Sequence, residues 1–147
     1  MKQATSKRRS RVSGKGTKVG TFRYRFEIAA TGDGPFQAID GLVDTGSLYT
    51  WIPRPTLVAL GVKPTERLEF LMANGERIHR DAAEVVIRLD SRLRHSICVF
   101  GDGKDLTLLG ALTLEQFTLA VDPANERLVP MPAIPAASAD GGAGTIE

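Results

Sequence analysis

The sequence has few side chains that bind metals or form disulfides: its 147 residues include one cysteine and two histidines. Cys98 has no partner for an internal disulfide, and it lies in an apolar run where a small buried side chain fits. One thiol and two imidazoles, His79 and His95, do not reproduce the ligand spacing of a zinc site. We therefore predict no metal site and no cofactor.

Long apolar runs are missing as well. No segment approaches the roughly 18 consecutive apolar residues that a membrane-spanning helix needs, and the N-terminus has no apolar core of a secretory signal. Apolar residues make up 42% of the chain and charged residues 24%, as in an ordinary globular protein. We expect one cytoplasmic domain with no membrane span.

Acidic residues are absent from the first eighteen positions, although the net charge is only +2. These positions hold the cationic residues Lys2, Lys7, Arg8, Arg9, Arg11, Lys15 and Lys18. Because this segment cannot bury apolar area, we predict a flexible basic arm at residues 1–18. A solvated tail is the simpler interpretation, since no aromatic residue is present to stack on a base; a weak contact with nucleic acid or an acidic surface is the alternative. Residues 131–147, rich in Pro, Ala and Gly, are predicted to form a second flexible tail.

Between the tails, apolar and polar residues alternate over short runs, which is typical of half-buried β-strands. The runs cover residues 22–28, 36–43, 68–72, 83–89, 93–100, 117–121 and 126–129. A short helix is predicted at 56–60, after Pro53 and Pro55 and before Gly61, and a helical turn at 111–115. Residues 19–130 are thus predicted to form one mainly β domain with one or two short helices.

A projecting hairpin is predicted around Asn74-Gly75, because Asn-Gly is a strong signal for a two-residue hairpin turn. Met72, Ala73, Asn74 and Gly75 would form its tip.

Asp44 ends an apolar run and is followed by Thr45, Gly46 and Ser47. A carboxylate at the end of a buried strand is costly unless it is hydrogen-bonded or paired. The two hydroxyls can supply hydrogen bonds, and the glycine permits a tight turn. An Asp-Thr-Gly triplet taken alone also fits an ordinary turn, so its context decides its interpretation.

Three features in the same order resemble the pepsin and retropepsin clan of aspartic peptidases. Residues 42–47 (LVDTGS), with Trp51-Ile52-Pro53 behind them, are similar to the active-site segment of that clan. The Asn74-Gly75 hairpin resembles the flap that closes over bound peptide. Leu108-Leu109-Gly110 and the helical turn after it resemble the element behind the catalytic loop. The resemblance covers residues 20–130 and is closest to the single-lobe, retroviral-type members, so it implies a closed β-barrel with one or two short helices.

The resemblance also implies an aspartic endopeptidase and a role for each matching residue. Asp44 would be catalytic, and Thr45, Gly46 and Ser47 would form the active-site loop. Thr45 would join two such loops across a twofold axis, and Ser47, where retroviral members commonly have Ala, would hydrogen-bond the Asp44 carboxylate. The flap would consist of Met72, Ala73, Asn74 and Gly75, and it lacks the tyrosine of pepsin flaps. Leu109 and Gly110 would support the loop, and Trp51 is expected in the core rather than in a subsite wall.

The number of carboxylates sets the predicted assembly. Two neighbouring carboxylates share one proton, so that one can activate water while the other hydrogen-bonds the peptide carbonyl. Only one Asp-Thr-Gly is present, so the second Asp44 is expected from an identical subunit in a twofold homodimer, which would act on a peptide or protein substrate. The alternatives are a catalytically silent dimer that binds peptides and a dimerised nucleic-acid binder that uses the basic arm.

Overall fold

The computed structural model describes residues 22–132, which form nine strands and two short helices. The basic arm predicted at residues 1–18, and the predicted tail beyond residue 132, lie outside this part. The helices are α1 (Arg54–Ala59) and α2 (Ala111–Gln116). The strands are β1 (Arg23–Ala29), β2 (Gln37–Asp44), β3 (Thr50–Pro53), β4 (Glu66–Leu71), β5 (Arg77–Leu89), β6 (Arg92–Gly101), β7 (Leu108–Gly110), β8 (Leu119–Asp122) and β9 (Arg127–Pro130). The predicted mainly β class with two short helices is confirmed.

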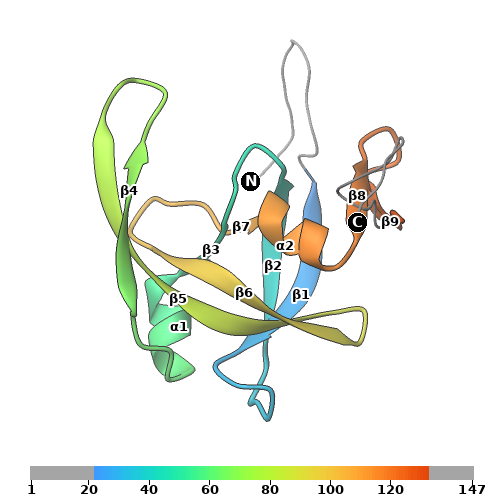
Figure 1. Ribbon diagram of the computed structural model, residues 1–147, viewed down its shortest axis with the longest axis horizontal. Helices are drawn as coiled ribbons and strands as arrows, with labels where there is room; N and C mark the ends of the chain where they lie inside the picture. Colours follow the sequence, from blue (N-terminus) through green and yellow to red (C-terminus); the bar gives the residue numbers. More distant parts are fainter. Residues whose placement is uncertain (1–21, 133–147) are drawn as a thin grey trace, which may run out of the picture.

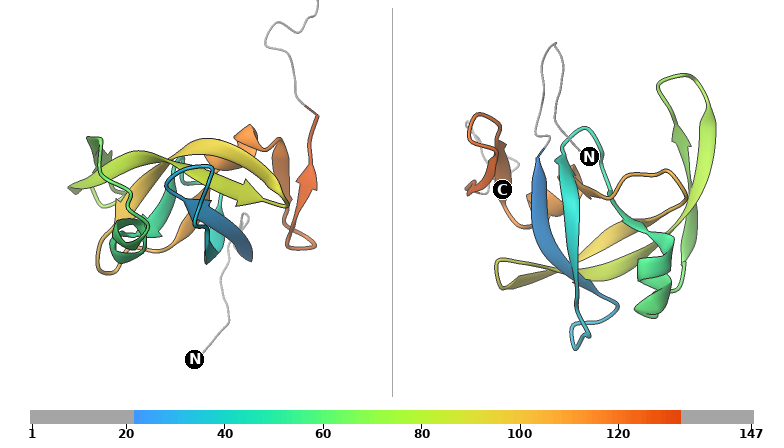
Figure 2. Two further views of the ribbon diagram at one scale, coloured as in Figure 1. Left: turned by 90° about the horizontal axis from the view of Figure 1, so that it is seen from below. Right: turned by 180° about the vertical axis from the view of Figure 1, so that it is seen from behind.

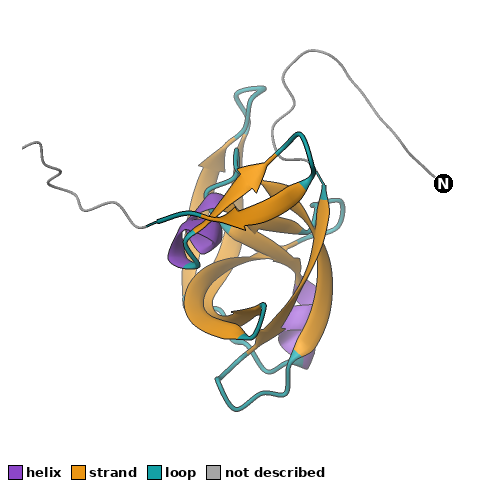
Figure 3. Cartoon of the chain, turned by 90° about the vertical axis from the view of Figure 1, so that its right-hand side faces the viewer, coloured by secondary structure: helices purple, strands orange, loops and turns teal. Residues whose placement is uncertain are grey.

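Six of the strands form a closed barrel, and Figure 3 shows the sheet curving back on itself. The hydrogen-bonded order is β1-β2-β7-β3-β6-β5, and β5 pairs back onto β1, with Ile87 opposite Ile28. The β2–β7 and β3–β6 pairs are parallel, and the other pairs of the ring are antiparallel. The closed barrel expected from the resemblance is therefore present.

Apolar side chains from every strand of the ring fill the barrel. The largest fully buried ones include Phe26, Ile28, Ile52, Ile87, Phe100 and Leu109. Each contributes about 1.5–3 kcal/mol relative to an exposed position. Cys98 is buried among them, as predicted, and burial raises the pKa of its thiol, so that this group is inert.

Strand β5 belongs partly to the barrel and partly to a hairpin outside it. Its first residues pair with β4 and are exposed or only partly buried, whereas Ala82 to Leu89 pair with β6 and are mostly buried. The β4–β5 hairpin therefore projects from the barrel, at the end of the molecule opposite to the two-stranded β8–β9 sheet (Figures 1 and 2).

The sequence patterns located most elements but missed the three-residue β7 and the strand β3. This strand has four residues and ends in Pro53, so it is too short to show the alternation that identifies a strand. It nevertheless lies in the middle of the sheet, between β6 and β7. Helix α1 ends as predicted before Gly61, which has φ +86°. Neither helix in the described part is long and apolar enough to cross a membrane.

Candidate active site

Asp44 is the last residue of β2, and the chain turns sharply after it. Its Oδ1 accepts a hydrogen bond from the Gly46 backbone N–H at 2.9 Å, and its carbonyl accepts one from the Ser47 N–H at 3.1 Å. A Cβ on Gly46 would lie 3.1 Å from the same Oδ1, so a side chain there would crowd the carboxylate. The half-buried Asp44 forms no salt bridge within residues 22–132. The turn therefore binds one oxygen of the carboxylate and leaves the group without a charged neighbour.

The two hydroxyls of the loop differ in what they contact. Ser47 Oγ donates to the Tyr49 carbonyl at 2.8 Å, so the expected hydrogen bond from Ser47 to the Asp44 carboxylate is wrong for this chain. The backbone turn directs the Ser47 side chain toward its own loop, and its hydrogen bond to the Tyr49 carbonyl helps to hold the loop conformation. Thr45 is exposed. Its predicted bond across a twofold axis requires a second chain and stays a prediction.

The element around Gly110 lies beside the loop, and the supporting role expected for Leu109 and Gly110 stays a prediction. Strand β7 runs parallel to β2, with Gly110 opposite Asp44 and the buried Leu109 opposite Val43. The first N–H groups of α2 donate to the loop: that of Ala111 to the Ser47 carbonyl at 2.8 Å and that of Leu112 to the Leu48 carbonyl at 2.9 Å. The helix start and the loop thus satisfy each other's backbone groups.

A buried cluster of three hydroxyls lies behind the loop, and no local sequence pattern indicates it. Thr113 Oγ1 is 2.7 Å from Thr50 Oγ1 and 2.9 Å from Ser96 Oγ, and the Gly110 N–H donates to Thr50 Oγ1 at 3.0 Å. All three side chains are buried. They come from β3, β6 and α2, so only the folded chain brings them together.

Replacing Thr113 by valine is expected to lower the free energy of unfolding by about 1–3 kcal/mol, because it leaves two buried hydroxyls with an apolar neighbour. Chemical denaturation measures the change. Thr65→Val is the matched control, since this exposed threonine makes only a 3.4 Å contact to the Ala82 carbonyl. An equal effect of the two substitutions would contradict the role of the cluster.

The predicted flap is the tip of the β4–β5 hairpin, but its turn differs from the predicted one. The Gly75 N–H donates to the Met72 carbonyl at 2.9 Å, and the Met72 N–H donates to the Glu76 carbonyl at 2.7 Å. A two-residue Asn-Gly turn would require positive φ at both residues, whereas only Gly75 has it, at +89°. The loop thus has three residues, Ala73, Asn74 and Gly75. The backbone of Asn74 is not in the left-handed conformation, and its side-chain Oδ1 accepts a hydrogen bond from the Glu76 N–H at 2.9 Å.

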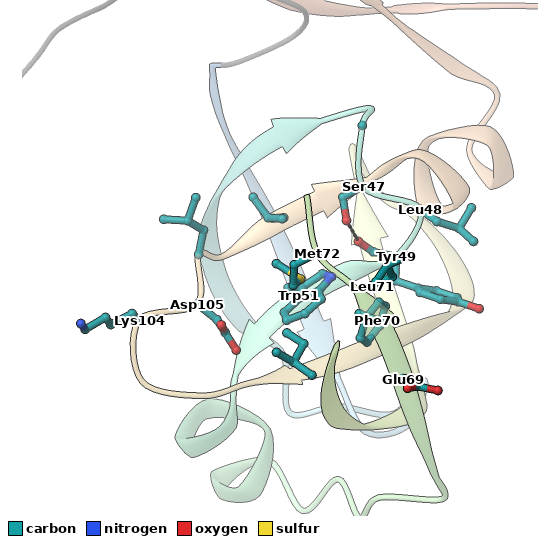
Figure 4. Close-up of a pocket in the computed structure, with 14 residues that line it drawn as sticks. Ser47, Leu48, Tyr49, Trp51, Glu69, Phe70, Leu71, Met72, Lys104 and Asp105 are labelled. Carbon is teal, nitrogen blue, oxygen red and sulfur yellow. Dashed lines mark hydrogen bonds between the residues drawn. The ribbon is translucent and has the colours of Figure 1, made fainter. Parts of the chain in front are cut away.

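An apolar groove of about 650 Å³ lies between the active-site loop, the hairpin and the segment before β7 (Figure 4). Gly46 and Ser47 line it beside Asp44, and Met72 lines it from the hairpin. Its other lining residues are Leu48, Tyr49, Trp51, Glu69, Phe70, Leu71, Ile78, Lys104, Asp105, Leu106 and Leu108. Of the predicted site residues, Gly46, Ser47 and Met72 line the groove, whereas Asp44, Thr45, Ala73, Asn74 and Gly75 are not among the residues that line it.

Three aromatic side chains form a cluster on one wall of the groove (Figure 4). Phe70 packs edge-on to Tyr49 with ring centroids 6.3 Å apart, and its ring lies 5.0 Å from that of Trp51. The expectation that Trp51 lies in the core is wrong. Side chains alternate along β3, so the buried Thr50 and Ile52 place Trp51 on the opposite face.

The charged side chains that line the groove are largely neutralised by arginines. Glu69 is 3.2 Å from Arg77, and Asp105 is 2.7 Å from Arg80. The hydrogen bond from Arg80 holds the pKa of Asp105 below its ordinary value, so this carboxylate is charged at neutral pH. Within the described residues no cluster of three or more His, Cys, Asp or Glu could hold a metal ion.

No protein-family model and no curated protein matches the sequence. Among solved structures, the chain is similar to the solution structure of a simian foamy virus protease, with a TM-score of 0.47 and 16% sequence identity, over 65% of this chain and 94% of that chain.

Proposed function

We propose that this chain is one subunit of an aspartic endopeptidase that acts as a homodimer. The observation that carries the proposal is the position of Asp44, in a tight Asp-Thr-Gly turn beside a large apolar groove. An acid placed there can act on a polar group of a ligand whose apolar side chains occupy the groove. Residues 19–130 would be the peptidase domain.

The need for two subunits follows from what the other aspartates of the described part do. Asp33 lies in the turn before β2, so the length of that strand, roughly 23 Å, separates it from Asp44. The remaining aspartates bond to other side chains: Asp40 to Arg23, Asp81 to Arg54 and Arg67, Asp90 to Tyr24, Asp102 to Arg54, Asp105 to Arg80, and Asp122 to Arg127. The second catalytic carboxylate would therefore be Asp44 of an identical subunit.

In the proposed mechanism the two Asp44 carboxylates share one proton, because two charged carboxylates at close range repel each other. The charged carboxylate takes a proton from water as the water oxygen attacks the peptide carbonyl, and it passes this proton to the amide nitrogen when the C–N bond breaks and the amine leaves. The protonated carboxylate hydrogen-bonds the carbonyl oxygen and stabilises the charge that develops there. The Gly46 N–H would orient the carboxylate. The hairpin would cover the bound peptide, which would pair with the hairpin backbone as an additional extended strand.

The experiment that tests this function is incubation of the purified full-length protein with a diverse peptide mixture between about pH 4 and 7, since the shared proton restricts the active range. We expect cleavage products in mass spectrometry, their loss with a statine-type inhibitor, and a dimer in sedimentation equilibrium. A strict monomer that cleaves peptides would contradict the mechanism. A dimer that binds the inhibitor without cleaving any peptide would instead identify a catalytically silent peptide-binding module.

A further inference from the structure

A continuous chain of ion pairs ends at the groove. It alternates three arginines and three aspartates, so its charges balance. The nitrogen–oxygen distances are 2.9 Å for Arg67–Asp81, 3.0 Å for Asp81–Arg54, 2.9 Å for Arg54–Asp102, 3.6 Å for Asp102–Arg80 and 2.7 Å for Arg80–Asp105.

The ion chain joins elements that are separate in the sequence. Arg67 belongs to β4, and Arg80 and Asp81 belong to β5, so it contacts both strands of the projecting hairpin. Asp102 and Asp105 lie in the segment 102–107 between β6 and β7, and three residues of this segment line the groove. The ion chain therefore connects the base of the hairpin to another wall of the groove.

The Arg80–Asp105 pair is the best-formed link. Arg80 donates from Nε to Asp105 Oδ2 at 2.7 Å and from Nη2 to Oδ1 at 3.2 Å, so the ion pair is bidentate. Both side chains are only 18% exposed, whereas those of the Arg77–Glu69 pair farther along the hairpin are 63% and 46% exposed. Exposed pairs contribute little because water screens them, so the Arg80–Asp105 link is expected to matter more.

Asp105 also determines the shape of its own segment. Its Oδ2 accepts the Asp102 N–H at 2.7 Å, and its N–H donates to the Asp102 carbonyl at 2.8 Å. Burial of apolar side chains does little to hold this segment, since Leu106 is 64% exposed and Lys104 is exposed as well. The position of this wall of the groove therefore depends on polar contacts rather than on the core.

We propose that Arg80 and Asp105 are positioning residues that set the width of the substrate groove by holding segment 102–107 against strand β5. The proposal deepens the peptidase function and rests on it only in taking a peptide as the occupant of the groove. Neither residue touches Asp44 by any hydrogen bond or ion pair of the described part, so the two side chains act on substrate binding rather than on the chemical step.

The contact is retained over the pH range in which the peptidase would be tested. The hydrogen bond from Arg80 lowers the pKa of Asp105 in the folded protein. The other charged groups around the pair are Asp102, Arg54 and Lys104, the residue before Asp105. A lowered folded pKa stabilises the fold above the unfolded value of about 4, and this stabilisation is lost as the pH falls through the folded pKa. The groove wall is thus expected to hold at pH 4–7 and to loosen in stronger acid.

Asp105→Asn and Arg80→Lys test the proposal. The first removes the negative charge of Asp105, and the second keeps the positive charge at position 80 but cannot form both hydrogen bonds of the guanidinium to the carboxylate. We expect the KM of a cleaved peptide to rise about tenfold in Asp105→Asn, equivalent to about 1.4 kcal/mol, with kcat within about twofold of wild type. Arg80→Lys should change KM in the same direction. The matched control is Glu27→Gln, which breaks the 2.7 Å pair of Glu27 with Arg88 between β1 and β5, away from the groove, and should leave KM unchanged.

Two readouts do not depend on activity. Trp51 is the single tryptophan and lines the groove, so its fluorescence can follow titration with a statine-type inhibitor, which should bind more weakly to Asp105→Asn. Hydrogen exchange of amides 102–107 should be faster in Asp105→Asn than in Glu27→Gln. If the wild type neither cleaves peptides nor binds the inhibitor, the peptidase function fails, and faster exchange still supports the positioning of the wall. If Asp105→Asn loses thermal stability but keeps wild-type KM, inhibitor affinity and exchange, the positioning role is overturned.

Discussion

Replacing Asp44 by asparagine is expected to lower the rate of peptide cleavage by about 10²–10⁴-fold, because the substitution removes the group that would exchange protons with water. The asparagine side-chain oxygen can still accept the 2.9 Å hydrogen bond from the Gly46 N–H, so the turn and the dimer should persist. Initial rates on the best peptide measure the loss, and sedimentation equilibrium and thermal unfolding measure what is retained.

The matched control is Asp33→Asn, which removes the same charge from an exposed turn at the other end of β2. Its cleavage rate should stay within about twofold of wild type, since surface substitutions away from a site have small effects. Cleavage by Asp44→Asn at the rate of this control would rule out Asp44 as the catalytic residue.

Replacing Gly110 by alanine is expected to destabilise the fold by about 3 kcal/mol or more, because of overpacking against backbone. A Cβ there would lie 2.3 Å from the Tyr49 carbonyl oxygen and 3.0 Å from that of Leu48. Backbone cannot rotate away as a side chain can, so the active-site loop itself would have to move. The midpoint of thermal unfolding should fall by more than about 10 °C, and any folded fraction should lose cleavage.

Gly32→Ala is the control for this substitution. Nothing lies within 4 Å of a Cβ on Gly32, and its φ is not in the left-handed region, so alanine fits there. We expect a change in the unfolding midpoint of no more than about 2 °C, of either sign. A Gly110→Ala protein as stable as this control would show that the close approach of Gly110 to the loop is not required.

Much of the barrel could be predicted from local patterns. Alternation identifies β1, β2, β5 and β6, because each has seven or more residues and so enough apolar positions to show a pattern. The tight turn after Asp44 was also expected, and the structure contains it, whereas the supporting role of Leu109 and Gly110 stays a prediction. The roles of Asp44 and Thr45 in a dimer stay predictions.

The remaining features depend on residues that are far apart in the sequence. No local pattern pairs Thr50 with Thr113 or Arg80 with Asp105, and a four-residue strand such as β3 has too little alternation to be recognised. Trp51 was misplaced because its residue type favours burial. The face of β3 on which it lies becomes visible only once the neighbouring strands are known.

The pairing of β2 with β7 has a consequence for the order in which the protein assembles. Asp44 lies opposite Gly110, which is 66 positions later in the chain, whereas the β5–β6 and β1–β2 hairpins join near neighbours. Contacts between distant residues form late, because a long loop must close first. The hairpins are therefore expected to form early, and the segment that supports Asp44 late. A nascent chain that ends before residue 108 would possess the Asp-Thr-Gly turn without the neighbouring strand β7, so the proposed site would be complete only at the end of folding.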